Sequence, residues 1–372
     1  MFTLIKNAHV YAPKDLGVKD VLISNNKIVE VKENIEFNYE HEEIDASGKY
    51  LFPGFIDQHV HIIGGGGENG FSSLIRELQV SDCVRYGVTS VIGLLGTDGH
   101  VKSIEQLVAR TKALKEHGMS AWCLTGSYEV PSVTLTGDVE RDIDFVDEII
   151  GCKVAMDDHR CSQPTKQELT RLASQCRIAG LLSNKVGEVH IHTGRGKDGY
   201  KKLLEIVEET DLPITQFRPT HVANQYESAL EFAKSGGYID FTANINDAKL
   251  IADTMNIIPL NQITMSSDSN GSFPIWSEDL KIIGMGVGKM ETLFSTVREM
   301  IVNENVEVEK ALSIITCNVA DALLLKHKGR IEKDKDADIV LVDADYNITD
   351  VWANGNEMVR DSNVVAKDYY QY

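Results

Sequence analysis

Two histidines separated by a single residue, His59 and His61, close the apolar stretch that begins at residue 54. Side chains alternate along a strand, so residues two apart share one face. Two imidazoles on one face at the C-terminal end of a strand can chelate a metal ion, and the four glycines at 64–67 let the backbone turn sharply beside it. A surface strand that happens to carry two histidines also explains this pair, so the interpretation depends on further ligands.

Further side chains of ligand type stand on or just after later apolar runs. Lys153 lies within one run, His192 ends another, and His221 and Asp268 each follow a further one. Each has an ordinary structural explanation by itself, since a lone histidine is commonly hydrogen-bonded within the fold and an aspartate can cap a helix. The six residues together predict a metal centre. His190 shares a strand face with His192 and is a rival ligand.

The elements that would hold these residues alternate between strands and helices from about residue 55 to residue 317. Short runs rich in valine and isoleucine predict buried strands at 55–60, 89–93, 121–125, 152–156, 188–191, 214–217, 238–242 and 263–267. Amphipathic stretches of helical length separate them, among them 72–86, 104–117, 166–183, 199–209, 225–235 and 247–256. Eight strand–helix units predict an α/β protein with a (β/α)8 barrel, whose active site gathers at the C-terminal strand ends. A doubly wound open sheet is the alternative, but residues 64–67 lack the Gly-x-Gly-x-x-Gly order of its first turn.

The two ends of the chain have a different pattern, with short strands, turns and no long helix. We expect residues 1–51 and 328–372 to form one small β-sandwich domain, and residues 52–327 to form the catalytic barrel. The chain has 372 residues, which suits a barrel with a small second domain.

Composition narrows the range of partners. The formal net charge of −19 argues against nucleic acid and against an acidic membrane surface. Six cysteines show no Cys-x-x-Cys pairing and are expected to be reduced thiols. The beginning of the chain lacks the pattern of a signal peptide, and no window is long enough to span a bilayer. We therefore expect a cytoplasmic protein with no nucleic-acid or membrane partner.

The ligand pattern resembles that of the amidohydrolase superfamily, which has His-x-His on strand one, a lysine on strand four, histidines on strands five and six, and an aspartate on strand eight. Longer motifs resemble the β-aspartyl (isoaspartyl) dipeptidases within that superfamily, and the likeness runs over nearly the whole chain. These motifs are Gly-Gly-Gly-Gly-Glu at 64–68, Gly-Leu-Leu-Gly-Thr-Asp at 93–98, Thr-Gly-Ser-Tyr at 125–128, Asp-His-Arg at 158–160 and Ser-Asp-Ser-Asn-Gly-Ser at 267–272.

The resemblance implies two Zn²⁺ ions per subunit, bridged by a hydroxide and by Lys153 carbamylated on its amine. A charged lysine beside two cations would be repelled, whereas a buried neutral amine can react with carbon dioxide. The implied ligands of one ion are His59, His61 and Asp268, and those of the other are His192 and His221, with His192 preferred to His190 by the family spacing. The family also implies a homo-oligomer.

The implied reaction is hydrolysis of the isopeptide bond of β-aspartyl dipeptides by the metal-bridging hydroxide. Asp268 would orient the hydroxide and pass its proton to the leaving amine, and Tyr128 would donate a hydrogen bond to the oxyanion. The resemblance gives the remaining site residues roles in binding the dipeptide. Glu68 and Thr97 would receive the free amino group, Arg160 would bind a carboxylate with its planar fork, and Ser272 would contact the aspartyl α-carboxylate.

One position departs from the dipeptidase pattern. Three residues after His221 that pattern has an arginine, and this chain has Asn224. Arg218, three residues before His221, is the candidate to replace the missing charge. The departure leaves open a related amidohydrolase that acts on cyclic amides or N-acyl amino acids. A metal-free barrel scaffold is a third alternative, which the six filled ligand positions disfavour.

Overall fold

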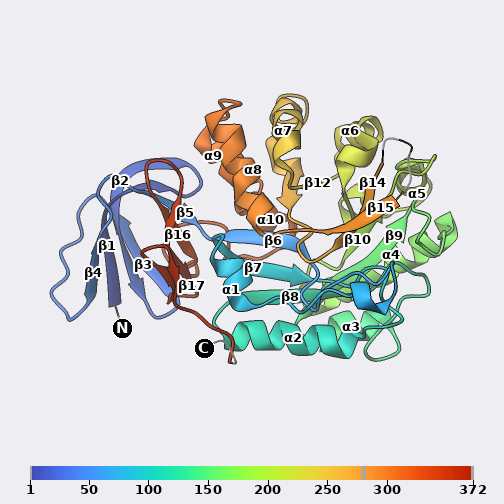
Figure 1. Cartoon of the computed structure of the whole chain (residues 1–372), viewed down its shortest axis with the longest axis horizontal. Coiled ribbons are helices and arrows are strands. Elements are labelled where there is room, and N and C mark those ends of the chain that lie inside the picture. The colour runs from blue at the N-terminus through green and yellow to red at the C-terminus, as the bar shows by residue number, and fades with distance from the viewer. Residues whose placement is uncertain (1, 278, 280–281, 370–372) are drawn as a thin grey trace.

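A computed structural model describes residues 2–277, 279 and 282–369 of the chain, so residues 1 and 370–372 of the expected terminal domain lie outside it. Two main sheets organise the molecule (Figure 1). The middle of the chain forms a barrel, and strands from both ends form a separate sheet beside it. Within the described part of the chain, no helix has both the length and the apolar character needed to cross a membrane.

The barrel consists of eight parallel strands, each hydrogen-bonded to the next in chain order. Its strands are β6 (Phe55–Val60), β7 (Val88–Gly93), β8 (Ser120–Gly126), β9 (Ile149–Met156), β10 (Glu188–Thr193), β11 (Phe217–Thr220), β12 (Ile239–Thr242) and β13 (Ile263–Ser266). The first and last strands nearly close the ring through a bridge between Val60 and Ser269. The backbone at Ile314 and Ile315 fills the remaining gap, accepting hydrogen bonds from Met265 N and Ile56 N. The predicted barrel is confirmed.

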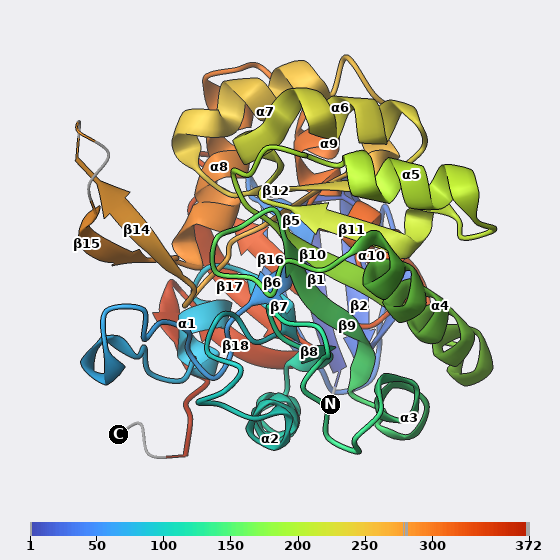
Figure 2. The same ribbon diagram turned by 90° about the vertical axis from the view of Figure 1, so that its right-hand side faces the viewer.

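Helices cover the outside of this barrel (Figure 2). They are α1 (Val80–Val84), α2 (Ile104–Glu116), α3 (Val139–Phe145), α4 (Lys166–Ser183), α5 (Lys201–Glu209), α6 (Tyr226–Lys234), α7 (Ala248–Thr254), α8 (Glu291–Val302), α9 (Val308–Ser313) and α10 (Cys317–Ala322). The two longest described helices, α2 and α4, begin at capping boxes whose N-cap residues are Ser103 and Thr165. An antiparallel hairpin of β14 (Ser272–Trp276) and β15 (Ile282–Val287) follows β13 and projects from the barrel (Figure 2).

Two predicted elements were wrong. The sixth strand is β11, and the segment predicted as this strand begins with a 3₁₀ turn, η2 (Ile214–Gln216). Pro219 lies inside β11, and a proline inside an apolar run normally argues against a central strand. The sequence therefore did not predict this strand at its observed position. The expected helix at 72–86 is mostly loop, since its backbone pairs with the glycine-rich segment instead. Ile75 N donates to Gly65 O, and Leu78 N donates to Ile62 O.

The second sheet joins the two ends of the chain. Its strands are β1 (Phe2–Tyr11), β2 (Asp15–Ser24), β3 (Lys27–Lys32), β4 (Glu42–Asp45), β5 (Tyr50–Pro53), β16 (Ile339–Val342), β17 (Ile348–Ala353), β18 (Asn356–Arg360) and β19 (Asn363–Val364). The junction is the antiparallel pair of β5 and β16, in which Leu51 faces Leu341. Because β5 runs on to Pro53, the sheet crosses the predicted boundary at residue 51, and the division into two domains stays a prediction.

Candidate metal centre and active site

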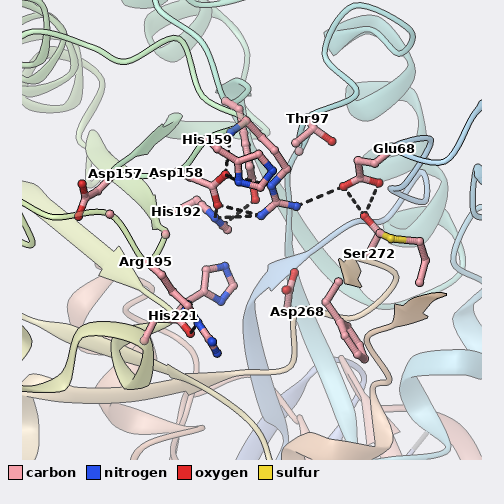
Figure 3. A pocket seen from close by; sticks show the side chains of 18 of the residues that line it. Glu68, Thr97, Asp157, Asp158, His159, His192, Arg195, His221, Asp268 and Ser272 are labelled. Atoms are coloured by element: carbon pink, nitrogen blue, oxygen red, sulfur yellow. Dashed lines mark hydrogen bonds and ion pairs between the residues drawn. The ribbon is translucent and has the colours of Figure 1, made fainter. Parts of the chain in front are cut away.

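A cavity of about 1530 Å³ opens at the C-terminal ends of the barrel strands (Figure 3). Two predicted ligands, His59 and Lys153, lie beneath it with fully buried side chains. The hairpin adds an apolar wall of Phe273, Ile283 and Met285. The other predicted site residues line the cavity itself: His61, Glu68, Thr97, Tyr128, Arg160, His192, His221, Asp268 and Ser272. Residues spread over more than two hundred positions of sequence therefore meet at one end of the barrel.

Three of the predicted ligands form a compact group. One ligand atom from each of His59, His61 and Asp268 lies within 4.8 Å of the others, and Asp268 Oδ1 is 3.3 Å from the Nε2 atom of each histidine. Barrel closure produces this group, because His61 N donates to Ser269 O at 2.9 Å and so holds the turn after β13 against the end of β6. Two imidazoles and a carboxylate converging on one point are a donor set suited to a divalent cation such as zinc.

A chain of buried hydrogen bonds orients the first of these histidines. Arg218 Nε donates to Glu188 Oε2 at 3.0 Å, and Glu188 Oε1 lies 3.1 Å from His190 Nδ1. His190 Nε2 in turn lies 3.0 Å from His59 Nδ1. A carboxylate only accepts, so His190 carries its proton on Nδ1 and accepts from His59 Nδ1–H. This leaves the lone pair of His59 Nε2 facing Asp268, as a metal ligand requires.

Lys153 approaches the same group from β9. Its Nζ lies 3.5 Å from His59 Nε2, and burial lowers its pKa to about 7, although Asp268, Asp240 and Glu188 oppose that shift. At neutral pH a large share of this amine is therefore uncharged. A permanently protonated lysine would be costly at a position with no exposure to solvent.

The predicted second ligand set has different contacts. His192 has both ring nitrogens engaged, with Nδ1 2.6 Å from Tyr128 Oη and Nε2 2.9 Å from Asp158 Oδ2. His221 Nδ1 lies 2.6 Å from Thr242 Oγ1. The rings of His192 and His221 nevertheless pack edge to face, with centroids 4.6 Å apart. Their assignment as ligands stays a prediction.

A charged network lines the wall beside the metal group (Figure 3). Arg160 forms a two-point contact with Asp158, with Nε 3.0 Å from Oδ1 and Nη2 2.9 Å from Oδ2. Its Nη1 reaches Glu68 Oε1 at 3.3 Å, and Ser272 Oγ donates to the same carboxylate at 2.7 Å. Burial alone would raise the pKa of Asp158, but hydrogen bonds from His192 and Arg160 hold it well below its usual range. The predicted ammonium acceptor Glu68 and the predicted carboxylate anchor Arg160 thus satisfy each other.

Tyr128 is buried beside this network, with the Arg160 guanidinium 5.6 Å from the centre of its ring. Burial raises the pKa of the Tyr128 phenol well above its usual value, so the group is a proton donor at neutral pH. Burial alone would also raise the pKa of Asp268, but the neighbouring imidazoles of His59, His61 and His221 lower it well below its usual value. Asp268 is therefore a carboxylate, able to accept a proton.

Sequence reasoning missed Glu188 and Arg195, and it quoted Asp158 within a motif without giving it a role. Glu188 was detectable, because it shares the strand face of His190 and His192 at a spacing of two. Arg218, the candidate to replace the arginine missing at Asn224, lies away from the cavity. Arg218 is only 1% exposed, is paired with Glu188 inside the barrel and does not line the cavity.

Comparison with known proteins finds a matching family model and similar solved structures. A family model described as "Amidohydrolase family" matches residues 50–358. The crystal structure of β-aspartyl dipeptidase from Fervidobacterium islandicum AW-1 in complex with β-Asp-Leu is 40% identical, with a TM-score of 0.93 over 99% of this chain and 100% of that one. A dihydropyrimidinase from Brevibacillus agri NCHU1002, 19% identical with a TM-score of 0.71 over 99% of this chain and 97% of that one, shares the fold.

Sequence relatives are more distant. An adenine deaminase of Bacillus subtilis is 25% identical over 374 residues, which cover 94% of this chain and 56% of the deaminase. A dihydroorotase of Macrococcus caseolyticus is 32% identical over 117 residues, which cover 32% of this chain and 26% of the dihydroorotase. The chain therefore spans about half the length, or less, of these two relatives.

Proposed function

The chain belongs to the amidohydrolase family, and from that premise we propose that it hydrolyses the isopeptide bond of β-aspartyl dipeptides with two zinc ions. The observation that carries the proposal is the set of Glu68, Arg160 and Ser272 beside the His59–His61–Asp268 group. A β-aspartyl dipeptide has one free ammonium and two carboxylates. Glu68 accepts from the ammonium, Arg160 offers the Nη1 group that now contacts Glu68 to a carboxylate, and Ser272 donates to the aspartyl α-carboxylate. The 40% identity with a β-aspartyl dipeptidase supports this substrate class.

The pairing of Glu68 with Arg160 is itself informative. At 3.3 Å each group satisfies the other, as a zwitterionic ligand would satisfy both. When a dipeptide enters the cavity, its carboxylate replaces Glu68 on Arg160 and its ammonium replaces Arg160 on Glu68, so neither charge is left without a partner. Asp158 stays on Arg160 throughout and keeps the guanidinium in place.

Three of the residues present, His59, His61 and Asp268, fit one divalent ion. In this proposal His192 and His221 would hold a second ion, and carbamylated Lys153 would serve as a ligand of both. Bound ions of this kind lower the pKa of water towards neutrality and polarise a carbonyl group. For His192 to bind through Nε2 it must leave Asp158, and Arg160 remains to neutralise that carboxylate.

The chain's own residues then handle protons and charge. Asp268, held as a carboxylate by the histidines around it, accepts the proton of the attacking water and passes it to the leaving amine. Tyr128, kept protonated by burial, donates its hydroxyl to the oxygen of the scissile carbonyl as charge develops there.

The deciding experiment is metal analysis combined with an assay of β-Asp-Leu hydrolysis. We expect two zinc ions per chain and turnover of β-Asp-Leu that a chelator abolishes. The local identity with a dihydroorotase favours hydrolysis of cyclic amides as the second candidate. Metal-loaded protein that opens a hydantoin or dihydroorotate and leaves β-Asp-Leu intact would replace the first proposal with the second. A homo-oligomer stays a prediction, to be measured by sedimentation.

A further inference from the structure

We infer that Arg195 binds the terminal carboxylate of the dipeptide's second residue, and that Asn224 positions it. This inference rests on the proposed function, because it assigns one end of the proposed substrate. Among the described residues, three lysine or arginine side chains line the cavity: Arg160, Arg195 and Lys197. Arg160 is held by Asp158 and can exchange only its contact with Glu68 for one substrate carboxylate. The second carboxylate of the dipeptide therefore needs another cation in the same cavity.

The guanidinium of Arg195 has a neutral partner. Its Nε donates to the amide oxygen of Asn224 at 3.1 Å, and no described acidic residue forms an ion pair with it. A neutral acceptor on Nε fixes the plane of the group and leaves both terminal nitrogens for a ligand. Two parallel N–H donors match the two oxygens of a carboxylate. Lys197, also exposed and without a described carboxylate partner, offers only a flexible point charge.

Asn224 is itself held in place, which makes it a rigid support. Its backbone N donates to His221 O at 2.9 Å, and its Nδ2 donates to Thr193 O at 3.4 Å. It therefore ties the end of β10 to the turn after β11, next to a predicted metal ligand. Asn224 stands where the dipeptidase pattern has an arginine. It holds Arg195, which the neighbouring loop supplies.

The loop around Arg195 is built for close packing. Gly194 and Gly196 flank the arginine, and a Cβ on either would lie 2.5 Å or less from atoms of Asp157. Gly196 N donates to Asp157 O at 2.8 Å, and Gly199 N donates to Asp157 Oδ2 at 3.0 Å. The backbone on both sides of Arg195 is therefore anchored, although its side chain is exposed.

The position of Arg195 suits the far end of a dipeptide. Arg195 and His221 lie on the opposite side of the cavity from Glu68 and Ser272, with Asp268 between the two sides (Figure 3). An ammonium bound at Glu68 and a terminal carboxylate bound at Arg195 place the bond between them near Asp268. Arg218 cannot take this role, because it is buried against Glu188.

The test compares β-Asp-Leu with its C-terminal amide, β-Asp-leucinamide, on zinc-loaded protein. Arg195→Gln should raise KM for β-Asp-Leu about ten- to hundredfold, the effect of one charge-assisted hydrogen bond, with little change in kcat. KM for the amide should stay the same, because the amide has no terminal carboxylate. Arg195→Lys should recover part of the loss. Asn224→Ala should raise KM by a smaller factor, again for β-Asp-Leu alone.

Lys197→Gln is the matched control, since it removes the same charge from the same loop and should have a clearly smaller effect. An equal rise of KM for both substrates in Arg195→Gln, or equal effects of Arg195→Gln and Lys197→Gln, would overturn the inference. If the parent protein is active and Arg195→Gln is unaffected, the role of Arg195 is refuted and the proposed function stands. A zinc-loaded parent protein inactive on both substrates refutes the proposed function, and the role of Arg195 with it.

Discussion

Replacing Glu188 by glutamine removes one charge from the buried chain that ends at His59. Glu188 is 1% exposed and accepts from Arg218 and His190 at 3.0 and 3.1 Å. Glutamine keeps the volume but leaves the Arg218 cation buried without its counter-charge, and breaking such a pair costs about 3–5 kcal/mol. Arg218 keeps a hydrogen bond to Ala322 O at 3.1 Å and its position 4.3 Å from the centre of the Tyr238 ring. We therefore expect a loss near the lower limit, about 3 kcal/mol in the free energy of unfolding.

Urea unfolding of the metal-free protein measures this loss as a lower midpoint with an unchanged slope. Asp253→Asn is the control, because it breaks the exposed Lys249–Asp253 pair and should cost less than about 1 kcal/mol. The double variant Glu188→Gln/Arg218→Met should be more stable than Glu188→Gln, since it removes the unpaired cation. A loss below about 1 kcal/mol for Glu188→Gln, or a double variant less stable than the single one, would refute the reasoning.

The pairing of Glu188 with Arg218 also predicts how stability depends on pH. Burial alone would raise the pKa of Glu188, but Arg218 and His190 hold it below its ordinary value. A carboxyl whose pKa is lower in the folded protein stabilises the fold fully above its unfolded pKa of about 4.3, and that contribution disappears as the pH falls through the folded value. The stability difference between the parent protein and Glu188→Gln should therefore be constant from about pH 6 to 8 and shrink in acid. A difference that grows in acid would contradict the assignment.

Three further variants test the proposed metal site and chemistry. Lys153→Ala should lose the pair of zinc ions and the activity, and added short carboxylic acids should partly restore both. Measurements of zinc content and turnover check this expectation. A variant that keeps two ions per chain would contradict a bridging lysine. Asp268→Asn should keep the fold and much of the metal but lose several orders of magnitude in kcat, because an amide cannot accept the proton, and near-normal kcat would refute that role. Tyr128→Phe should lower kcat about 10²- to 10³-fold, and a change confined to KM would make Tyr128 a binding residue instead.

Strand alternation allowed much of the site to be predicted. His59, His61 and His192 were placed on inward strand faces by a spacing of two, and the strand–helix rhythm predicted the barrel that collects them at one end. These are local properties, because the alternation of side chains follows from the covalent geometry of each strand.

Contacts between distant segments decided the rest. The backbone of residues 75–78 is not helical, because it pairs with the glycine-rich loop. The register of β10 against β11 buries Arg218 beside Glu188 rather than in the cavity, where the sequence distance to His221 had suggested it.

Residue types and spacing alone therefore determined the ligand candidates, the barrel and the family resemblance. The family resemblance grouped Asp268 with His59 and His61, but only the tertiary structure showed that barrel closure brings them together and that Asn224 supports Arg195. The physical reason is that a side chain's direction along a strand is set by its own backbone, whereas its partner across the barrel depends on how all eight strands pack together.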